Sequence, residues 1–132
     1  MFVLVAGLLL AVAPRASAGT TAERVHAAAL EFCRAHPTLE SLRRDGYTPV
    51  RPGATHWANF AGPARFDLDR PRQAVVRGGK LVGVLHAQAL RLGGLPDFGP
   101  PARPHTHAGG RTEMLHVWCS DDPRVAFSPH GR

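Results

Sequence analysis

The chain has 132 residues, of which 44% are apolar and 20% are charged, so its composition is that of a globular protein rather than a disordered one. This length suffices for one small domain. The net charge is +6, but the basic residues are scattered and no aromatic residues alternate with them, so nucleic-acid binding is not expected. Arginines can hold phosphate groups through paired hydrogen bonds, which leaves an anionic polymer of the cell envelope as a candidate partner.

The first 18 residues have the pattern of a cleavable signal peptide. Residues 2–13 form an apolar run, Pro14 breaks it, and Ala16-Ser17-Ala18 supplies the small residues that a signal peptidase requires. A membrane-spanning helix needs about 20 apolar residues, so the run is too short to remain as an anchor. No Lys or Arg precedes it, which a start codon assigned too far downstream would explain. We predict a signal peptide over 1–18 and one domain over 19–132, located outside the cell or in its envelope.

The segment after the predicted cleavage site favours helix. Thr20-Thr21-Ala22-Glu23 has the pattern of a capping box, and apolar residues then recur at helical spacing as far as Ala35. His36-Pro37 is expected to end this helix. Residues 38–44 predict a short second helix, and residues 47–50 are expected to be extended.

The middle of the chain contains the clearest strand signal. Residues 51–72 include several Pro and Gly and show no period, so we expect a loop there. Residues 73–77 and 81–89 are apolar and extended in pattern, and Gly78-Gly79-Lys80 between them predicts a hairpin turn.

The last third mixes an irregular stretch with one more strand. Residues 91–110 hold five glycines and four prolines and are not expected to be regular, which is typical of a functional or disordered loop. Residues 113–119 predict a strand, and the tail from Pro123 is expected to be a loop. Together these elements predict an α+β fold, in which the N-terminal helix packs on a small, mostly antiparallel sheet with long Gly/Pro-rich loops.

The two cysteines predict a disulfide. In an oxidising compartment an isolated pair of cysteines usually forms a bond, and Cys33–Cys119 would join the first helix to the last strand. The alternative is a thiolate metal ligand or nucleophile. No Cys-x-x-Cys motif or cysteine-protease context accompanies either residue, so we favour the structural bond.

Four histidines form a candidate site. His105-Thr106-His107 places two imidazoles on the same side of an extended chain, and His116 follows in a strand beside Trp118. His56 lies next to Trp57 in the Gly/Pro-rich loop. Three imidazoles that converge and leave one position open would suit zinc or copper. The alternative is that these are ordinary exposed or hydrogen-bonded histidines.

No catalytic signature is present. The sequence lacks Gly-x-Ser-x-Gly, His-Glu-x-x-His, a phosphate-binding loop with lysine and a dinucleotide-binding fingerprint. Glu113 and Asp121-Asp122 have no spacing that identifies a catalytic acid or base. We therefore predict no catalytic residue.

Several short stretches, read together, resemble a family of small exported bacterial proteins that has no established activity. The similar motifs cover most of residues 45–123 and are Asp45-Gly46-Tyr47, His56-Trp57-Ala58-Asn59, Leu68-Asp69-Arg70-Pro71, Gln73-Ala74-Val75-Val76, Leu81-Val82-Gly83-Val84 and Leu115-His116-Val117-Trp118 with Asp122-Pro123. The chain departs from the pattern at Phe60-Ala61, where the family has a proline, and at Cys119, where it has an aliphatic residue. The resemblance implies a secreted domain in which His56 and His116 belong to recurring elements.

The expected function is that of an exported binding protein, non-catalytic or of undetermined activity, whose candidate site for a metal or small ligand is the histidine cluster. A small metal-dependent hydrolase and a structural protein of the cell envelope are the alternatives. The predicted ligands of a zinc or copper ion are His56, His105, His107 and His116, and the other residues expected to contact a ligand are Trp57, Asn59 and Trp118.

Overall fold

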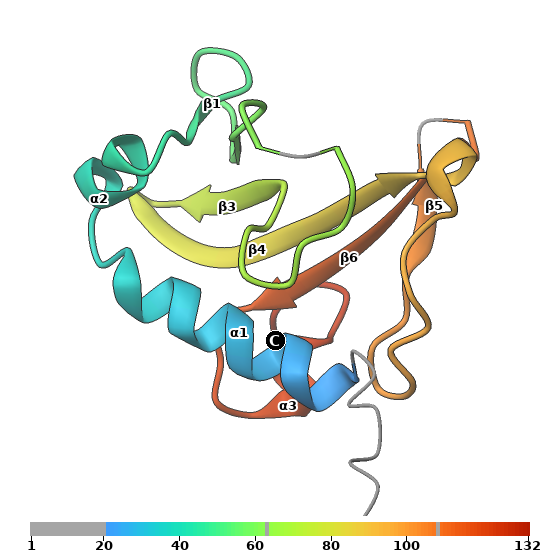
Figure 1. The fold of residues 1–132 in the computed structure, drawn as a ribbon. Helices are drawn as coiled ribbons and strands as arrows, with labels where there is room; N and C mark the ends of the chain where they lie inside the picture. The colour runs from blue at the N-terminus through green and yellow to red at the C-terminus, as the bar shows by residue number, and fades with distance from the viewer. Residues whose placement is uncertain (1–20, 63, 108) are drawn as a thin grey trace, which may run out of the picture.

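The computed structural model describes residues 21–62, 64–107 and 109–132, and it has an α+β architecture with helices on one face of a six-stranded antiparallel sheet (Figure 1). The predicted signal peptide and its cleavage site lie outside these residues. Within them, no helix is long and apolar enough to cross a membrane.

Helix α1 (Ala22–Ala35) forms as predicted and buries one apolar stripe. Its buried residues, Val25, Ala29 and Phe32 among them, recur at helical spacing. Thr21 is the N-cap and its hydroxyl accepts from the Arg24 N–H at 3.4 Å. Glu23 therefore stands one position too early to complete the expected capping box.

The short helix α2 (Leu39–Arg44) also forms as predicted. It carries a true capping box between Thr38 and Ser41, each of whose hydroxyls accepts from the other's backbone N–H. Leu42 is fully buried and anchors this helix to the core.

The strands lie in the order β1-β2-β3-β4-β6-β5, and every neighbouring pair is antiparallel. The predicted hairpin is confirmed as β3 and β4, and the predicted last strand is confirmed as β6. The strand bounds are β1 Thr48–Pro49, β2 His56–Ala58, β3 Gln73–Arg77, β4 Lys80–Ala89, β5 His105–His107 and β6 Thr112–Trp118.

Three segments expected to be irregular contain regular structure. Strand β2 lies inside the predicted loop 51–72, and β5 lies inside the stretch 91–110, which begins within the 3-10 helix η1 (Leu90–Leu92). The tail contains helix α3 (Pro123–Ala126), whose N-cap Asp122 accepts from the Arg124 N–H at 2.9 Å. Strands β2 and β5 have only three residues each, so their formation depends on pairing with β3 and β6 rather than on a local pattern.

The sheet has two different faces. One face packs against α1 and forms the main core with buried side chains such as Trp57, Val84 and Val117. On the opposite face, where none of the described helices packs, Leu85 is 1% exposed and Trp118 is 5% exposed. We call this second face the histidine face, because it presents His56, His105, His107 and His116 beside Val75, Leu85 and Trp118.

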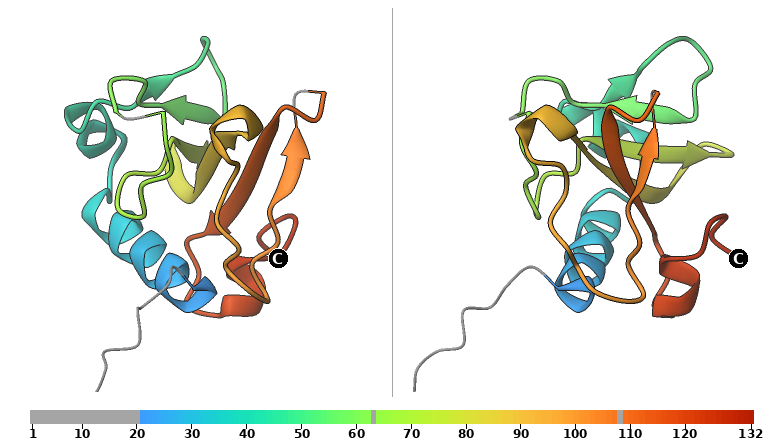
Figure 2. Two further views of the ribbon diagram at one scale, coloured as in Figure 1. Left: turned by 45° about the vertical axis from the view of Figure 1, so that its right-hand side comes forward. Right: turned by 90° about the vertical axis from the view of Figure 1, so that its right-hand side faces the viewer.

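A long segment borders the sheet on the side of β5 and β6. After η1 the chain runs down alongside β6 to the N-terminal end of α1 and then returns to begin β5 (Figure 2). It is held there because the Ala22 N–H donates to the Phe98 carbonyl at 2.7 Å. Phe98 and Ala102 of this segment are buried in the core, so the segment is packed rather than loose.

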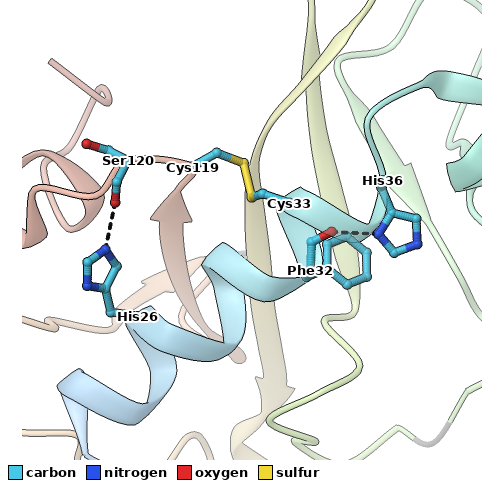
Figure 3. Close-up of a disulfide and its surroundings, with 6 residues drawn as sticks. All are labelled: His26, Phe32, Cys33, His36, Cys119 and Ser120. Carbon is cyan, nitrogen blue, oxygen red and sulfur yellow. Dashed lines mark hydrogen bonds between the residues drawn. A yellow bond between two sulfur atoms is a disulfide. The ribbon is translucent and has the colours of Figure 1, made fainter.

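The predicted disulfide is confirmed. Cys33 in α1 and Cys119, directly after β6, are bonded with 6.0 Å between their Cα atoms (Figure 3). Nearby, His26 Nε2 is hydrogen-bonded to the Ser120 carbonyl at 2.7 Å, a second link between the same helix and the end of the same strand. A disulfide is compatible with a protein that folds in an oxidising compartment.

Candidate functional site: a histidine cluster beside a cavity

Strands β2, β5 and β6 bring the four predicted histidines together on the histidine face. His116 lies at the centre, with its ring centroid 5.7 Å from that of His105 and 6.1 Å from that of His56. His107 lies at the end of the row, 6.1 Å from His105. Residues separated by up to 60 positions in the sequence thus form one cluster.

The approach of His56 to His116 requires the sheet to curl. Strands β3 and β4 lie between them, and in a flat sheet three strand spacings would separate the two backbones by about 14 Å. The observed 6.1 Å between the rings shows that the sheet closes toward the histidine face. Figure 1 shows the bend in β4, and the β-bulge between Val75 and Val76 adds to it.

Gly83 lets the sheet close in this way. A Cβ at position 83 would lie 2.8 Å from Trp118 Cε3 and 3.1 Å from the Val117 carbonyl oxygen, so any side chain there would displace the indole ring. Trp118 fills the space over Gly83, and Arg77 covers its ring at 4.7 Å from the centroid. The indole Nε1 donates to the Ser128 carbonyl at 2.7 Å, which fixes the ring.

Trp118 in turn supports the central histidine. Its ring stacks on that of His116 with 5.6 Å between centroids and 17° between planes. Trp118, which was predicted to contact a ligand, therefore lies against the central histidine of the cluster but does not line the cavity described below. Trp118 is nearly fully buried, so it packs against His116 but offers little of its own surface to a ligand.

The cluster keeps its central imidazole neutral. Burial, followed by repulsion from His105, His56, His107 and Arg77 in that order, lowers the pKa of His116 to about 4. Burial also lowers the pKa of His56, with added repulsion from Arg77 and His107. Neutral imidazole is the form that binds metal ions and that can both donate and accept hydrogen bonds.

The rings are close together but do not aim at one point. The planes of His105 and His116 differ by only 5°, so the two imidazoles lie parallel instead of converging. Among residues 21–62, 64–107 and 109–132, no group of three or more His, Cys, Asp or Glu side chains is arranged to hold a metal ion.

A cavity of about 600 Å³ opens beside the cluster. Its lining includes Arg103, His105 and His116, which we call its polar side, and its remaining lining is mostly apolar. This volume lies within the usual range of small-molecule sites, about 300–1,000 Å³. The other lining residues are Pro101, Leu115, Phe127, Ser128 and Pro129.

Two predicted contact residues lie elsewhere. Trp57 alternates with His56 along β2 and is therefore on the opposite face, in the core, where Arg43 covers its ring at 5.0 Å. The Asn59 side chain donates to the Asp45 carbonyl and accepts from the Ala61 N–H, both at 3.1 Å, so it organises its own turn. The structure brings neither side chain to the histidine cluster.

Other histidines contribute to the fold. His36 is buried, with Nδ1 hydrogen-bonded to the Phe32 carbonyl at 2.7 Å and Nε2 to the Asp45 carboxylate at 2.9 Å. His86 is buried in the core against Phe66, on the opposite side of the sheet from the cluster.

Sequence reasoning missed Arg103 and Phe127 as part of the site. Arg103 lies in the Gly/Pro-rich segment before β5, and Phe127 is the C-cap of α3. Neither belongs to a motif, and their shared position depends on how two distant loops pack beside β6.

No family model, curated protein or solved structure matches this chain. The site is therefore interpreted from its own geometry.

Proposed function

We propose that this chain is an exported, non-catalytic binding protein whose ligand occupies the cavity beside the histidine cluster. The observation that carries the proposal is that His105 and His116 line the polar side of a cavity of about 600 Å³ whose other walls are largely apolar. A concave, mainly apolar pocket with a few polar groups on one side is typical of small-molecule sites.

Export is supported by the disulfide and by the leader-like composition of residues 1–18. The non-catalytic assignment is supported by the lining of the cavity, which contains no carboxylate. Among the described residues, no carboxylate is a charge neighbour of His116, so the cluster lacks the acidic partner that orients the imidazole in a catalytic triad.

A transition-metal ion is the second candidate ligand, favoured by the spacing of the imidazoles. Two histidine nitrogens bind zinc at about 2.0–2.1 Å, so the rings of two ligands must lie close together, as those of His56, His105 and His116 do. The parallel rings of His105 and His116 would have to rotate to share one ion. The small-ligand proposal needs no such rearrangement.

The experiment is a titration followed by NMR of the histidine side chains in the mature protein. A fragment library and, separately, Zn²⁺ and Cu²⁺ are added to the wild type, to His116→Ala and to His130→Ala. His130 is an exposed histidine that lines a different cavity, so its loss controls for general effects of removing an imidazole. Near-ultraviolet circular dichroism confirms that each variant is folded.

We expect at least one addition to shift the His105 and His116 signals in the wild type and in His130→Ala, and to bind at least about tenfold more weakly to His116→Ala, a loss of about 1.4 kcal/mol. No response to any fragment or metal would contradict the proposal, as would an equal response in all three proteins.

A further inference from the structure

We infer that the ligand of this cavity is a carboxylate joined to an apolar group. The inference rests on the proposed function and identifies the chemical class of its ligand. It follows from the combination of an arginine and two histidines with apolar residues in the cavity lining, and from the sign of the charge there.

The polar side of the cavity is suited to an anion. Arg103 carries a permanent positive charge and can hold a carboxylate through two parallel hydrogen bonds. His105 and His116 add ring N–H donors beside it. No acidic residue lines the cavity, so Arg103 has no competing carboxylate there.

The one hydroxyl in the lining already has partners. Ser128 Oγ donates to the Val125 carbonyl at 2.8 Å and accepts from the Arg132 N–H at 3.1 Å. The arginine and the two imidazoles are therefore the groups that select the polar end of a ligand.

The rest of the cavity is suited to an apolar group. Leu115, Phe127 and two prolines form these walls, and Leu115 belongs to the hydrophobic core. A hydrocarbon or aromatic body placed against them would lose contact with water, at about 25 cal/mol per Å² of apolar surface buried. A ligand with only charged or polar groups would leave these walls unused.

The charge of the ligand separates it from a metal ion. A carboxylate would be attracted by the guanidinium of Arg103, whereas a metal ion would bind imidazole nitrogens and would be repelled by that cation.

The test uses isothermal titration calorimetry with 3-phenylpropionate and its neutral amide, 3-phenylpropionamide, on the mature protein at pH 7.0. The variants are Arg103→Gln and the control Arg111→Gln, an exposed arginine outside the cavity lining. A hydrogen bond to a charged group contributes about 1.5–3 kcal/mol, which corresponds to at least about tenfold in affinity.

We expect the acid to bind at least about tenfold tighter than the amide. The preference for the acid should disappear in Arg103→Gln and persist in Arg111→Gln. Equal binding of acid and amide would overturn the inference and leave the proposed function standing. Binding of neither probe would also overturn it, and the fragment and metal titrations then decide the proposed function separately.

Two sources could supply such a carboxylate, a free organic acid or the C-terminus of a peptide. A further arm compares 3-phenylpropionate with N-acetyl-alanyl-phenylalanine and its C-terminal amide. Tighter binding of the free-acid peptide than of 3-phenylpropionate would identify a peptide terminus, and weaker binding would identify a small organic acid. Either result supports the carboxylate-binding assignment.

Discussion

The imidazole of His105 lies parallel to that of His116, with 5.7 Å between ring centroids and 5° between ring planes. Repulsion between two charged imidazoles disfavours protonation of the buried one, so His105 lowers the pKa of His116. The pKa of His116 therefore depends on the presence of His105.

We predict that His116 stays neutral until the pH approaches 4, because burial and then His105 lower its pKa to about 4. Substituting His105→Ala should raise the pKa of His116, since it removes the largest charge effect and exposes the ring. His107→Ala is the matched control and should raise it less, because His107 has a weaker effect on His116. The measurement is an NMR titration of the His116 ring signals. A pKa near 6.5 for His116 in the wild type would contradict the prediction, because it would show that burial and neighbouring charges do not lower it.

We predict that Gly83→Ala destabilises the protein by about 1–3 kcal/mol, since the added methyl group collides with the buried Trp118 ring. The free energy of unfolding, measured in urea, gives the magnitude. Trp118→Leu removes the obstructing ring, so the cost of Gly83→Ala should be smaller in that background. If the losses in free energy of unfolding of Gly83→Ala and Trp118→Leu simply add in the double variant, the cost of Gly83→Ala does not come from a collision with the indole ring.

We predict that loss of the disulfide lowers the free energy of unfolding by about 4–5 kcal/mol in the chain-entropy description. The bond closes a loop with a sequence separation of 86 residues, so it removes many conformations from the unfolded chain. The double variant Cys33→Ser/Cys119→Ser should match the reduced wild type and should not respond to dithiothreitol. Two free thiols in the exported protein, found by mass spectrometry without reduction, would contradict the bond itself.

We predict that acid destabilises the protein through His86. Burial lowers the pKa of His86 to about 4, below its ordinary value of 6.5, so its neutral form is favoured in the folded state. Its contribution is therefore fully present above pH 6.5 and is lost as pH falls toward 4, by about 3 kcal/mol. Urea unfolding between pH 7 and 4 should show a smaller loss for His86→Gln than for the wild type. Parallel curves for the two proteins would exclude His86 as the cause.

The regular parts of the fold could be predicted because they have local signals. Helix α1 has both a period and a hydroxyl cap, and the β3–β4 hairpin has apolar strands around Gly78-Gly79. Helix α3 had a signal that was overlooked, because Asp122-Pro123 places a capping residue before a proline, a common way to begin a helix. Strands β2 and β5 are too short to produce a period.

The site was predictable only in part, for a different reason. The i and i+2 spacing of His105 and His107 shows that they share a face, but their closeness to His56 depends on how far the sheet curls. That curl results from the Val75–Val76 bulge and from the packing of Trp118 over Gly83, which are long-range effects. Trp57 was assigned to the site because it adjoins His56, whereas strand alternation directs it into the core.

The loop that the disulfide closes contains only part of the cavity lining. Arg103, His105 and His116 lie within the covalent ring that Cys33 and Cys119 close, whereas Phe127 lies on the tail that leaves it. That tail is retained by weaker ties such as the hydrogen bond from the Trp118 indole to Ser128. On warming, the tail should detach while the ring still holds its histidines, so the part of the apolar wall formed by Phe127 would be lost before Leu115 and the polar residues.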